Sequence, residues 1–140
     1  MRQITGYLAF RTSGPGLVPI DREVGAWLGE HGVREGLLTL LCQHTSASLT
    51  IQENADPDVA LDLQDALGRL APHGGRERYR HASEGPDDMA GHIRTVLSGV
   101  HLAIPVIDGR LALGTWQGLW LWEHRDRPRE RRVALHLLAD

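Results

Sequence analysis

The sequence predicts an α+β protein with mixed, largely antiparallel β-sheets and about three helices, folded as a single compact domain over residues 1–140. Three observations predict this class. Segments rich in β-branched and aromatic residues stand near both ends, segments with helical spacing lie between them, and Asp108-Gly109 has the composition of a tight hairpin turn. Hydrophobic residues make up 41% of the chain and charged residues 24%, which is the composition of a globular protein.

The first third of the chain predicts strand, helix and strand in turn. Residues 3–12 (QITGYLAFRT) are typical of a strand, which ends at the glycine and proline residues of 13–16. An apolar spacing of i, i+3, i+4 predicts a short amphipathic helix over residues 21–30. The apolar run Leu37–Cys42 is typical of a strand buried on both faces, and we expect strand structure to continue over residues 42–51.

Two further helices are expected before the last strands. Asp56-Pro57 is a helix start, with a capping carboxylate followed by proline, and this helix should end near Pro72. Residues 73–86 form a polar loop of a length that is more often functional than not. The third helix should cover residues 87–98 and bury one apolar stripe, made of Met89, Ile93, Val96 and Leu97. The remaining strands are expected at residues 100–107, 111–124 and 133–138.

Composition excludes several functions. All fifteen basic residues are arginine, so a lysine Schiff base and a P-loop lysine are ruled out. The net charge of −3 argues against a nucleic-acid partner. The single cysteine, Cys42, forbids an intramolecular disulfide and a multi-cysteine zinc site. No apolar stretch approaches the ~20 residues of a membrane span, and the N-terminus lacks a signal-peptide layout, so we expect a cytoplasmic protein with no membrane partner.

The segment 42–51 carries an unusual polar pattern. Strand alternation would place Cys42, His44, Ser46, Ser48 and Thr50 on one face. This face either meets water or forms the floor of a polar pocket. In the second case, the hydroxyl groups would bind an anion and His44 would ligate a metal or transfer protons.

Histidines from separate elements are the candidate metal ligands. Asp88 and His92 are four residues apart on a helix, so they form either a surface pair or a metal ligand with its orienting carboxylate. His44, His92 and His124 together would make a zinc-type set with an open fourth position. His81, in the polar loop, is the other candidate for proton transfer.

Two other features of the sequence each allow two interpretations. Cys42 ends an apolar run, which favours a buried, inert thiol over a nucleophile activated by His44. The run of alternating charges over residues 125–132 is either a solvated loop or a rim that collects anions.

Several segments together resemble the YjbQ family. They are HTSASLTIQENADPDV (44–59), YRH with EG (79–85), DDMAGHI (87–93), and DGRLALGTWQG (108–118) running on to EHR (123–125). The resemblance implies a compact α+β subunit that assembles as a homotrimer, consistent with the tryptophan-rich strand at 116–122. It also implies a pocket around His44, His81, His92 and His124. The family is often labelled a secondary thiamine-phosphate synthase.

That activity would require a site that holds phosphate groups and neutralises the departing charge. Arg80 and Arg125 would bind phosphate, the hydroxyls of Ser46, Ser48 and Thr115 would donate hydrogen bonds, and Trp116 would lie against a heterocycle. A zinc-like divalent metal would sit on His44, His92, His124 and Asp88, with His81, His124 and Glu123 as catalytic groups. Two classes of function stay open: an enzyme acting on a small phosphorylated or anionic metabolite, and a non-catalytic ligand-binding or regulatory trimer.

Overall fold

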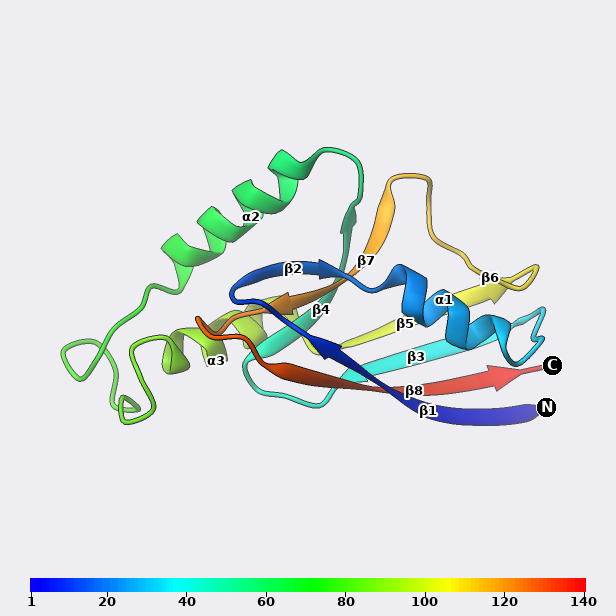
Figure 1. Cartoon of the computed structure of the whole chain (residues 1–140), viewed down its shortest axis with the longest axis horizontal. Coiled ribbons are helices and arrows are strands. Elements are labelled where there is room, and N and C mark those ends of the chain that lie inside the picture. The colour runs from blue at the N-terminus through cyan, green and yellow to red at the C-terminus, as the bar shows by residue number, and fades with distance from the viewer.

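A computed structural model describes all 140 residues and confirms the α+β class. In chain order the helices separate strands that are far apart in sequence but adjacent in space, such as β1 and β8 (Figure 1). The elements are β1 (Arg2–Arg11), β2 (Gly16–Pro19), α1 (Asp21–Gly29), β3 (Gly36–Cys42), β4 (Ala47–Glu53), α2 (Pro57–Leu70), α3 (Asp88–Ser98), β5 (His101–Ile107), β6 (Arg110–Leu111), β7 (Gln117–Glu123) and β8 (Glu130–Ala139).

The strands form two sheets, and every pairing within them is antiparallel. The larger sheet has the order β1-β8-β3-β5-β6, and the smaller has the order β2-β7-β4. Arg2 pairs with Ala139, so the two ends of the chain lie side by side (Figure 1). As the sequence predicts, Asp108 and Gly109 both take positive φ, 50° and 77°, in the tight turn between β5 and β6.

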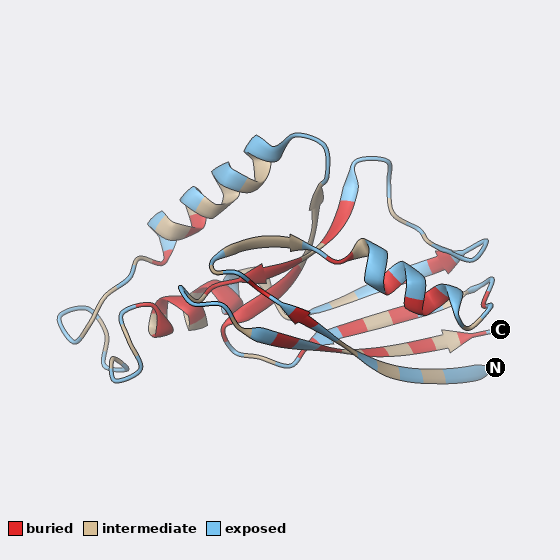
Figure 2. Ribbon diagram, viewed as in Figure 1, coloured by how far each residue is buried: buried red, intermediate tan, exposed pale blue.

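The main core lies between one face of the larger sheet, the smaller sheet and α1. Alternation along β3 points Leu38 and Leu40 into this core, whereas Leu37 and Leu41 are 40% and 43% exposed. The prediction that this strand is buried on both faces is therefore wrong, because no element of the same chain covers the outer face of the larger sheet. Figure 2 shows the resulting alternation of buried and exposed residues along the strands.

The expected continuous strand over residues 42–51 is broken. Residues 43–46 leave β3 in the larger sheet and start β4 in the smaller one. The amide of Cys42 donates to the carbonyl of Val100, whereas the amide of Gln43 donates to Arg132 on the other side of β3. A single alternating face that includes Cys42, His44 and Ser48 therefore does not exist.

The expected long strand over residues 111–124 is also divided. β6 is only two residues long, and a loop separates it from β7. The Gln117 side chain accepts a hydrogen bond from the Gly114 amide at 2.7 Å, and the Gln117 amide donates back to the Gly114 carbonyl at 3.0 Å. These two bonds hold a turn where the sequence predicts extended chain. The short strand β2, which pairs with β7, was not expected from the sequence.

Helix α2 begins as the sequence predicts, with the Asp56 side chain accepting from the Asp58 amide at 2.9 Å ahead of Pro57. Its apolar stripe is only partly covered, since Leu67 is buried and Leu70 is 71% exposed. Figure 2 shows that most of α2 is accessible to solvent.

Helix α3 buries a different face from the one that its apolar residues predict. The buried positions include Asp88, Gly91 and Thr95, whereas Val96 is 83% exposed. A Cβ on Gly91 would lie 3.3 Å from the Cβ of Ser46 and 3.7 Å from the Cβ of His124. The missing side chain therefore lets α3 approach β4 and the end of β7 closely, and this approach decides which face is inside.

Candidate functional site

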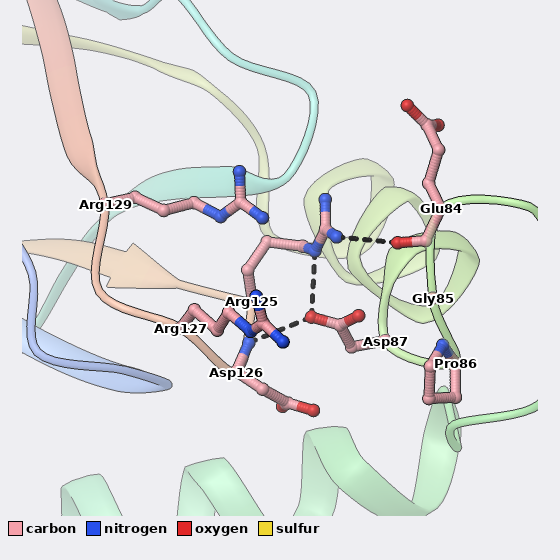
Figure 3. Close-up of a pocket in the computed structure, with 8 residues that line it drawn as sticks. All are labelled: Glu84, Gly85, Pro86, Asp87, Arg125, Asp126, Arg127 and Arg129. Carbon is pink, nitrogen blue, oxygen red and sulfur yellow. Dashed lines mark hydrogen bonds and ion pairs between the residues drawn. The ribbon is translucent and has the colours of Figure 1, made fainter.

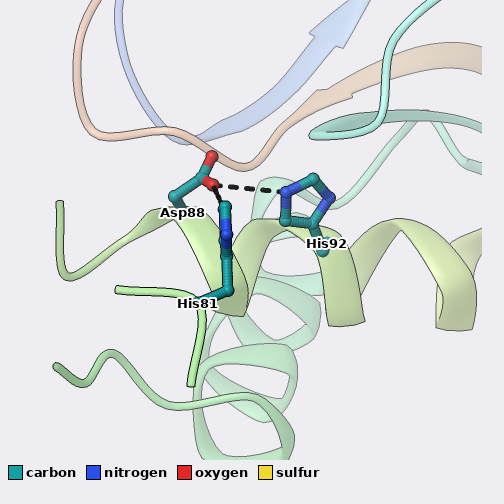
Figure 4. Close-up of side chains that lie close together, drawn as sticks. All are labelled: His81, Asp88 and His92. Atoms are coloured by element: carbon teal, nitrogen blue, oxygen red, sulfur yellow. Dashed lines mark hydrogen bonds and ion pairs between the residues drawn. The ribbon is translucent and has the colours of Figure 1, made fainter. Parts of the chain in front are cut away.

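Two histidines converge on one carboxylate at the start of α3. The Nε2 atoms of His81 and His92 lie 2.6 Å and 3.2 Å from the same oxygen, Oδ2 of Asp88 (Figure 4). Candidate ligand atoms of the three side chains all lie within 4.8 Å of one another. We call these three residues the histidine–aspartate cluster.

The positions of Asp88 and His92 follow from the local structure of α3, whereas the position of His81 depends on contacts within the loop before it. Asp88 and His92 are one helical turn apart, as the sequence predicts. His81 reaches them because the loop before α3 folds back on itself. The Tyr79 hydroxyl donates to the Pro72 carbonyl at 2.8 Å, and the amide of Gly74 donates to the Pro86 carbonyl at 3.0 Å.

Arg125 holds the acidic end of the cluster in place. Its Nε donates to Oδ2 of Asp87 at 2.9 Å, its Nη1 to Oδ1 of Asp88 at 2.6 Å, and its Nη2 to the carbonyl of Glu84 at 3.0 Å. Asp88 therefore uses one oxygen for Arg125 and the other for the two histidines. All three guanidinium nitrogens of Arg125 are engaged within the chain, which argues against the predicted role of Arg125 in binding a ligand.

The charges in the cluster stabilise one another. Burial opposes ionisation of Asp88, but the hydrogen bond from His81 and the charge of Arg125 outweigh it, so the pKa of this carboxyl lies below its ordinary value. The hydrogen bond to Asp88, and the charges of Asp88 and Glu84, raise the pKa of His81. Glu84 also contacts His81 directly, with Oε2 2.9 Å from Nε2.

A pocket of about 380 Å³ lies on the other side of Arg125 (Figure 3). It opens between two segments, 84–87 before α3 and 125–129 after β7, and contains no hydrophobic residue. Its lining residues are Glu84, Gly85, Pro86, Asp87, Arg125, Asp126, Arg127 and Arg129. We call this the arginine pocket.

The three histidines predicted to share a metal are not brought together within one chain. The cluster at His92 contains His81 in place of His44 and His124. His44 lies elsewhere, and its Nε2 accepts a hydrogen bond from the Arg132 amide at 2.8 Å. His44 follows directly after β3 and stays beside β8 of the larger sheet, so the break between β3 and β4 leaves it away from His92.

His124 is fully buried beneath α3. Its Nε2 lies 2.8 Å from the Ser48 hydroxyl, and its Nδ1 has no hydrogen-bond partner. Burial lowers the pKa of His124 to about 3, so the ring is neutral at physiological pH. A ring with no access to solvent favours a structural role over the predicted metal-binding and catalytic roles.

Glu123 points to the opposite face of β7 and is also fully buried. Its carboxylate accepts hydrogen bonds from the Arg131 guanidinium, from the Thr12 hydroxyl at 2.8 Å and from the amides of His124 and Arg125 at 3.1 Å. Burial opposes its ionisation, but these partners, Arg131 first, lower the pKa of Glu123 below its ordinary value. A carboxylate with all its acceptor sites engaged is arranged for structure rather than for catalysis.

The predicted ligand-binding residues are dispersed. Ser46 and Ser48 are buried, and the Ser46 hydroxyl accepts from Arg131 at 3.1 Å, so neither hydroxyl lines the arginine pocket. Arg80 is exposed on the loop beside His81. Thr115 and Trp116 are exposed in the loop between β6 and β7, which is far along the molecule from α3 (Figure 1).

Four residues around this site have roles that the sequence does not assign to them individually, although an anion-collecting rim is one of the two interpretations of the run 125–132. Asp87 and Glu84 connect Arg125 and His81 to the segment before α3, and Arg127 and Arg129 line the arginine pocket. The adjacent acids Asp87-Asp88 and the arginine-rich run after β7 were the available signals. Neither signal reveals that the two segments meet.

Two antiparallel sheets, with a histidine–aspartate cluster at one end of the third helix, define a small α+β protein of the YjbQ-like class. The family model described as "UPF0047 protein YjbQ-like" matches residues 7–140, and the chain belongs to this family. It is 49% identical over 139 residues to the UPF0047 protein sll1880 of Synechocystis, covering 99% of this chain and 94% of that protein. It is 48% identical over 108 residues to YjbQ of Salmonella typhimurium, covering 77% of each chain.

Solved structures show the same fold. A conserved hypothetical protein from Thermus thermophilus superposes with a TM-score of 0.84 at 42% identity, covering 95% of this chain and 99% of that one. A YjbQ/UPF0047 protein from Clostridium acetobutylicum superposes with a TM-score of 0.85 at 36% identity, covering 94% and 98%. None of the helices in this chain has the length and apolar character needed to cross a membrane.

Proposed function

We propose that the chain is an enzyme acting on a small phosphorylated or anionic metabolite, with its reactive centre at the histidine–aspartate cluster. One observation carries the proposal. Two imidazole nitrogens from different segments, His81 and His92, lie 2.6 Å and 3.2 Å from the same oxygen of a buried carboxylate. Arg125 holds that carboxylate from its other oxygen.

The donor set fits a zinc-like divalent metal. Two imidazoles and one carboxylate are a known catalytic zinc combination, in which the fourth position stays open for water or substrate. Ligand atoms around tetrahedral zinc are about 3–4 Å apart, and the atoms here lie within 4.8 Å of one another, so small side-chain rotations would suffice. A metal held by His81, Asp88 and His92 would supply Lewis acidity toward an anionic oxygen.

The chain's own residues would also position and move protons. Where no metal is bound, Nε2 of His81 faces Asp88 and the ring is partly exposed, which is the arrangement of an imidazole oriented by a carboxylate for proton transfer. Arg125 fixes the Asp88 rotamer, and Asp87 in turn fixes Arg125. We assign Arg125 and Asp87 positioning roles.

We propose weak thiamine-phosphate-synthase-like activity as the finer assignment. Its support is the proximity of the cluster to the arginine pocket, since the reaction joins two phosphorylated molecules and releases pyrophosphate. The assay supplies the pyrimidine pyrophosphate and the thiazole phosphate to the purified wild-type protein and to a His81→Gln variant. Product formation by the wild type alone supports the assignment, and equal rates in the two proteins overturn it.

The experiment for the reactive centre is zinc binding to protein purified without a histidine tag. Isothermal titration should give one site per chain in the wild type and at least ~100-fold weaker binding in His92→Gln, because a direct ligand matters more than the residues behind it. His101→Gln, which alters an exposed histidine on β5, is the matched control and should bind zinc like the wild type. Equal affinity in His92→Gln and His101→Gln would exclude the cluster as the metal site.

We also propose a homotrimer, because the outer face of the larger sheet exposes Tyr7, Leu41 and Ile107 with no covering element. Light scattering should give three times the chain mass of 15.5 kDa at micromolar concentration. A monomeric mass would refute the trimer.

A non-catalytic ligand-binding or regulatory trimer is the alternative function, favoured if ligands bind the cluster and are released unchanged. The buried free thiol of Cys42 is compatible with the cytoplasmic location that we propose.

A further inference from the structure

We infer that the arginine pocket is an oxyanion subsite, in which Arg127 and Arg129 bind the phosphoryl group of the ligand. The inference rests on the proposed function for the nature of the ligand, and it names the residues that recognise its charged group. Both arginines lie in the run 125–132, for which an anion-collecting rim is one of the two interpretations that the sequence allows. The residues named individually for phosphate are placed differently, since Arg125 is engaged within the chain and Ser46 and Ser48 are buried.

The charges that line the pocket leave two cations without partners. Of the carboxylates, Asp87 binds Arg125, Glu84 lies 2.9 Å from His81, and Asp126 lies 3.5 Å from His73. Among the arginines, only Arg125 forms an ion pair, whereas Arg127 and Arg129 form none. Each acidic group thus has its own nitrogen-bearing neighbour, and the guanidinium groups of Arg127 and Arg129 are left without a carboxylate partner.

Arg129 carries a second sign of an absent partner. Its Nε is buried and has no hydrogen-bond acceptor in the chain. Its backbone is held in place, because the Arg129 amide donates to the Thr12 hydroxyl at 3.0 Å and the Arg129 carbonyl accepts from the Thr12 amide at 2.8 Å. A buried N–H without an acceptor is unfavourable, so a rotation of the Arg129 side chain that turns Nε toward an oxyanion in the pocket would be favoured.

The pocket and the histidine–aspartate cluster share a wall. Arg125 contacts Asp87 in the pocket and Asp88 in the cluster, and Glu84 lines the pocket while it contacts His81. Figure 3 shows the arginine side chains facing the segment 84–87, and Figure 4 shows the cluster at the start of the helix that follows. One ligand could therefore place a charged group on Arg127 and Arg129 and its reacting part near His81.

The chemistry favours a phosphoryl group over a carboxylate. A phosphate monoester carries a charge of about −1.5 to −2 at pH 7, which matches two unpaired guanidinium groups. Its three terminal oxygens can accept from two arginines at once, whereas one carboxylate is satisfied by one bidentate arginine. The polar lining and the volume of about 380 Å³ leave room for the part of the ligand that bears the phosphate.

The test is inorganic phosphate binding at constant ionic strength, measured by isothermal titration and by thermal melts. The variant is Arg127→Gln/Arg129→Gln, and the matched control is Arg22→Gln, which removes an exposed charge from α1. We expect phosphate affinity to fall at least ~10-fold in the double variant, because one charge-assisted hydrogen bond is worth about that factor or more. Arg22→Gln should bind phosphate like the wild type. Sodium acetate at the same ionic strength should bind more weakly to the wild type than phosphate does.

Zinc binding by the same variants separates this inference from the proposed function. Loss of phosphate binding with unchanged zinc affinity in the double variant supports the subsite. Equal phosphate affinity in the double variant and in Arg22→Gln overturns it, as does a wild type that gains no stability from phosphate. Tighter binding of acetate than of phosphate would overturn the choice of ligand class. A circular dichroism spectrum shows whether each variant is folded. If the double variant does not fold, phosphate binding is measured in Arg127→Gln alone, which changes an exposed position.

Discussion

Arg131 donates two hydrogen bonds to the carboxylate of Glu123 inside the protein, one from Nε to Oε1 at 2.8 Å and one from Nη2 to Oε2. Both side chains are buried. The second guanidinium nitrogen also donates to the Ser46 carbonyl at 3.0 Å, so the pair ties β8 and β7 to the start of β4. An ion pair of this kind joins the two sheets at the point where the chain passes from one to the other.

We predict that Glu123→Gln will lower the free energy of unfolding by about 3–5 kcal/mol, because it leaves the Arg131 charge buried without a counterion. Urea denaturation followed by circular dichroism measures the effect. Glu130→Gln, at an exposed position on β8, is the matched control and should change stability by less than about 0.5 kcal/mol. A loss below about 1 kcal/mol in Glu123→Gln would contradict the structural role.

We predict that His124 makes the fold sensitive to acid. Burial lowers its folded pKa to about 3, whereas the unfolded value is ordinary, so between these values only the unfolded state takes up the proton. Stability is therefore lost as the pH falls below about 6.5. At pH 4.5 the contribution of this histidine should be about 2–3 kcal/mol smaller than at pH 7.5.

The measurement compares wild type and His124→Gln by urea denaturation at both pH values. The difference in unfolding free energy between the two proteins should shrink on acidification, since glutamine does not titrate. His101→Gln, which alters an exposed histidine, should show a constant difference from wild type. A difference for His124→Gln that is the same at both pH values would refute the prediction.

We predict that Arg125→Gln weakens zinc binding by about 10–100-fold without removing a direct ligand, because Asp88 loses the partner that fixes its rotamer. The measurement is competition with a chromophoric zinc chelator. Arg22→Gln serves as the control for loss of one positive charge. Unchanged zinc affinity in Arg125→Gln would show that the rotamer of Asp88 is set by other contacts.

We predict that Cys42 does not react with alkylating reagents in the native state. Burial raises the pKa of its thiol to about 11, so the thiolate is scarce at neutral pH and the sulfur is covered. Iodoacetamide at pH 8 should label the cysteine only after denaturation, as mass spectrometry would reveal. Rapid labelling of the folded protein would contradict this prediction and would favour the alternative in which Cys42 is a nucleophile.

The sequence by itself determined the features that depend on near neighbours along the chain. Asp56 followed by Pro57 specifies a helix start, Asp108-Gly109 specifies a hairpin turn, and the spacing of Asp88 and His92 specifies a shared helix face. Each of these requires only local hydrogen bonding and backbone preference, which residue identity encodes directly.

Only the tertiary structure decided which distant groups meet. His81 joins the cluster, Arg125 holds Asp88, and His124 is buried because α3 lies close to β4. That approach depends on Gly91, whose lack of a side chain turns the polar face of α3 inward and leaves Val96 outside. Helical periodicity ranks residues by hydrophobicity, whereas packing ranks them by how closely two backbones can approach. The site depends on how closely the backbones of α3 and β4 approach, and a single sequence does not show which backbones will come close.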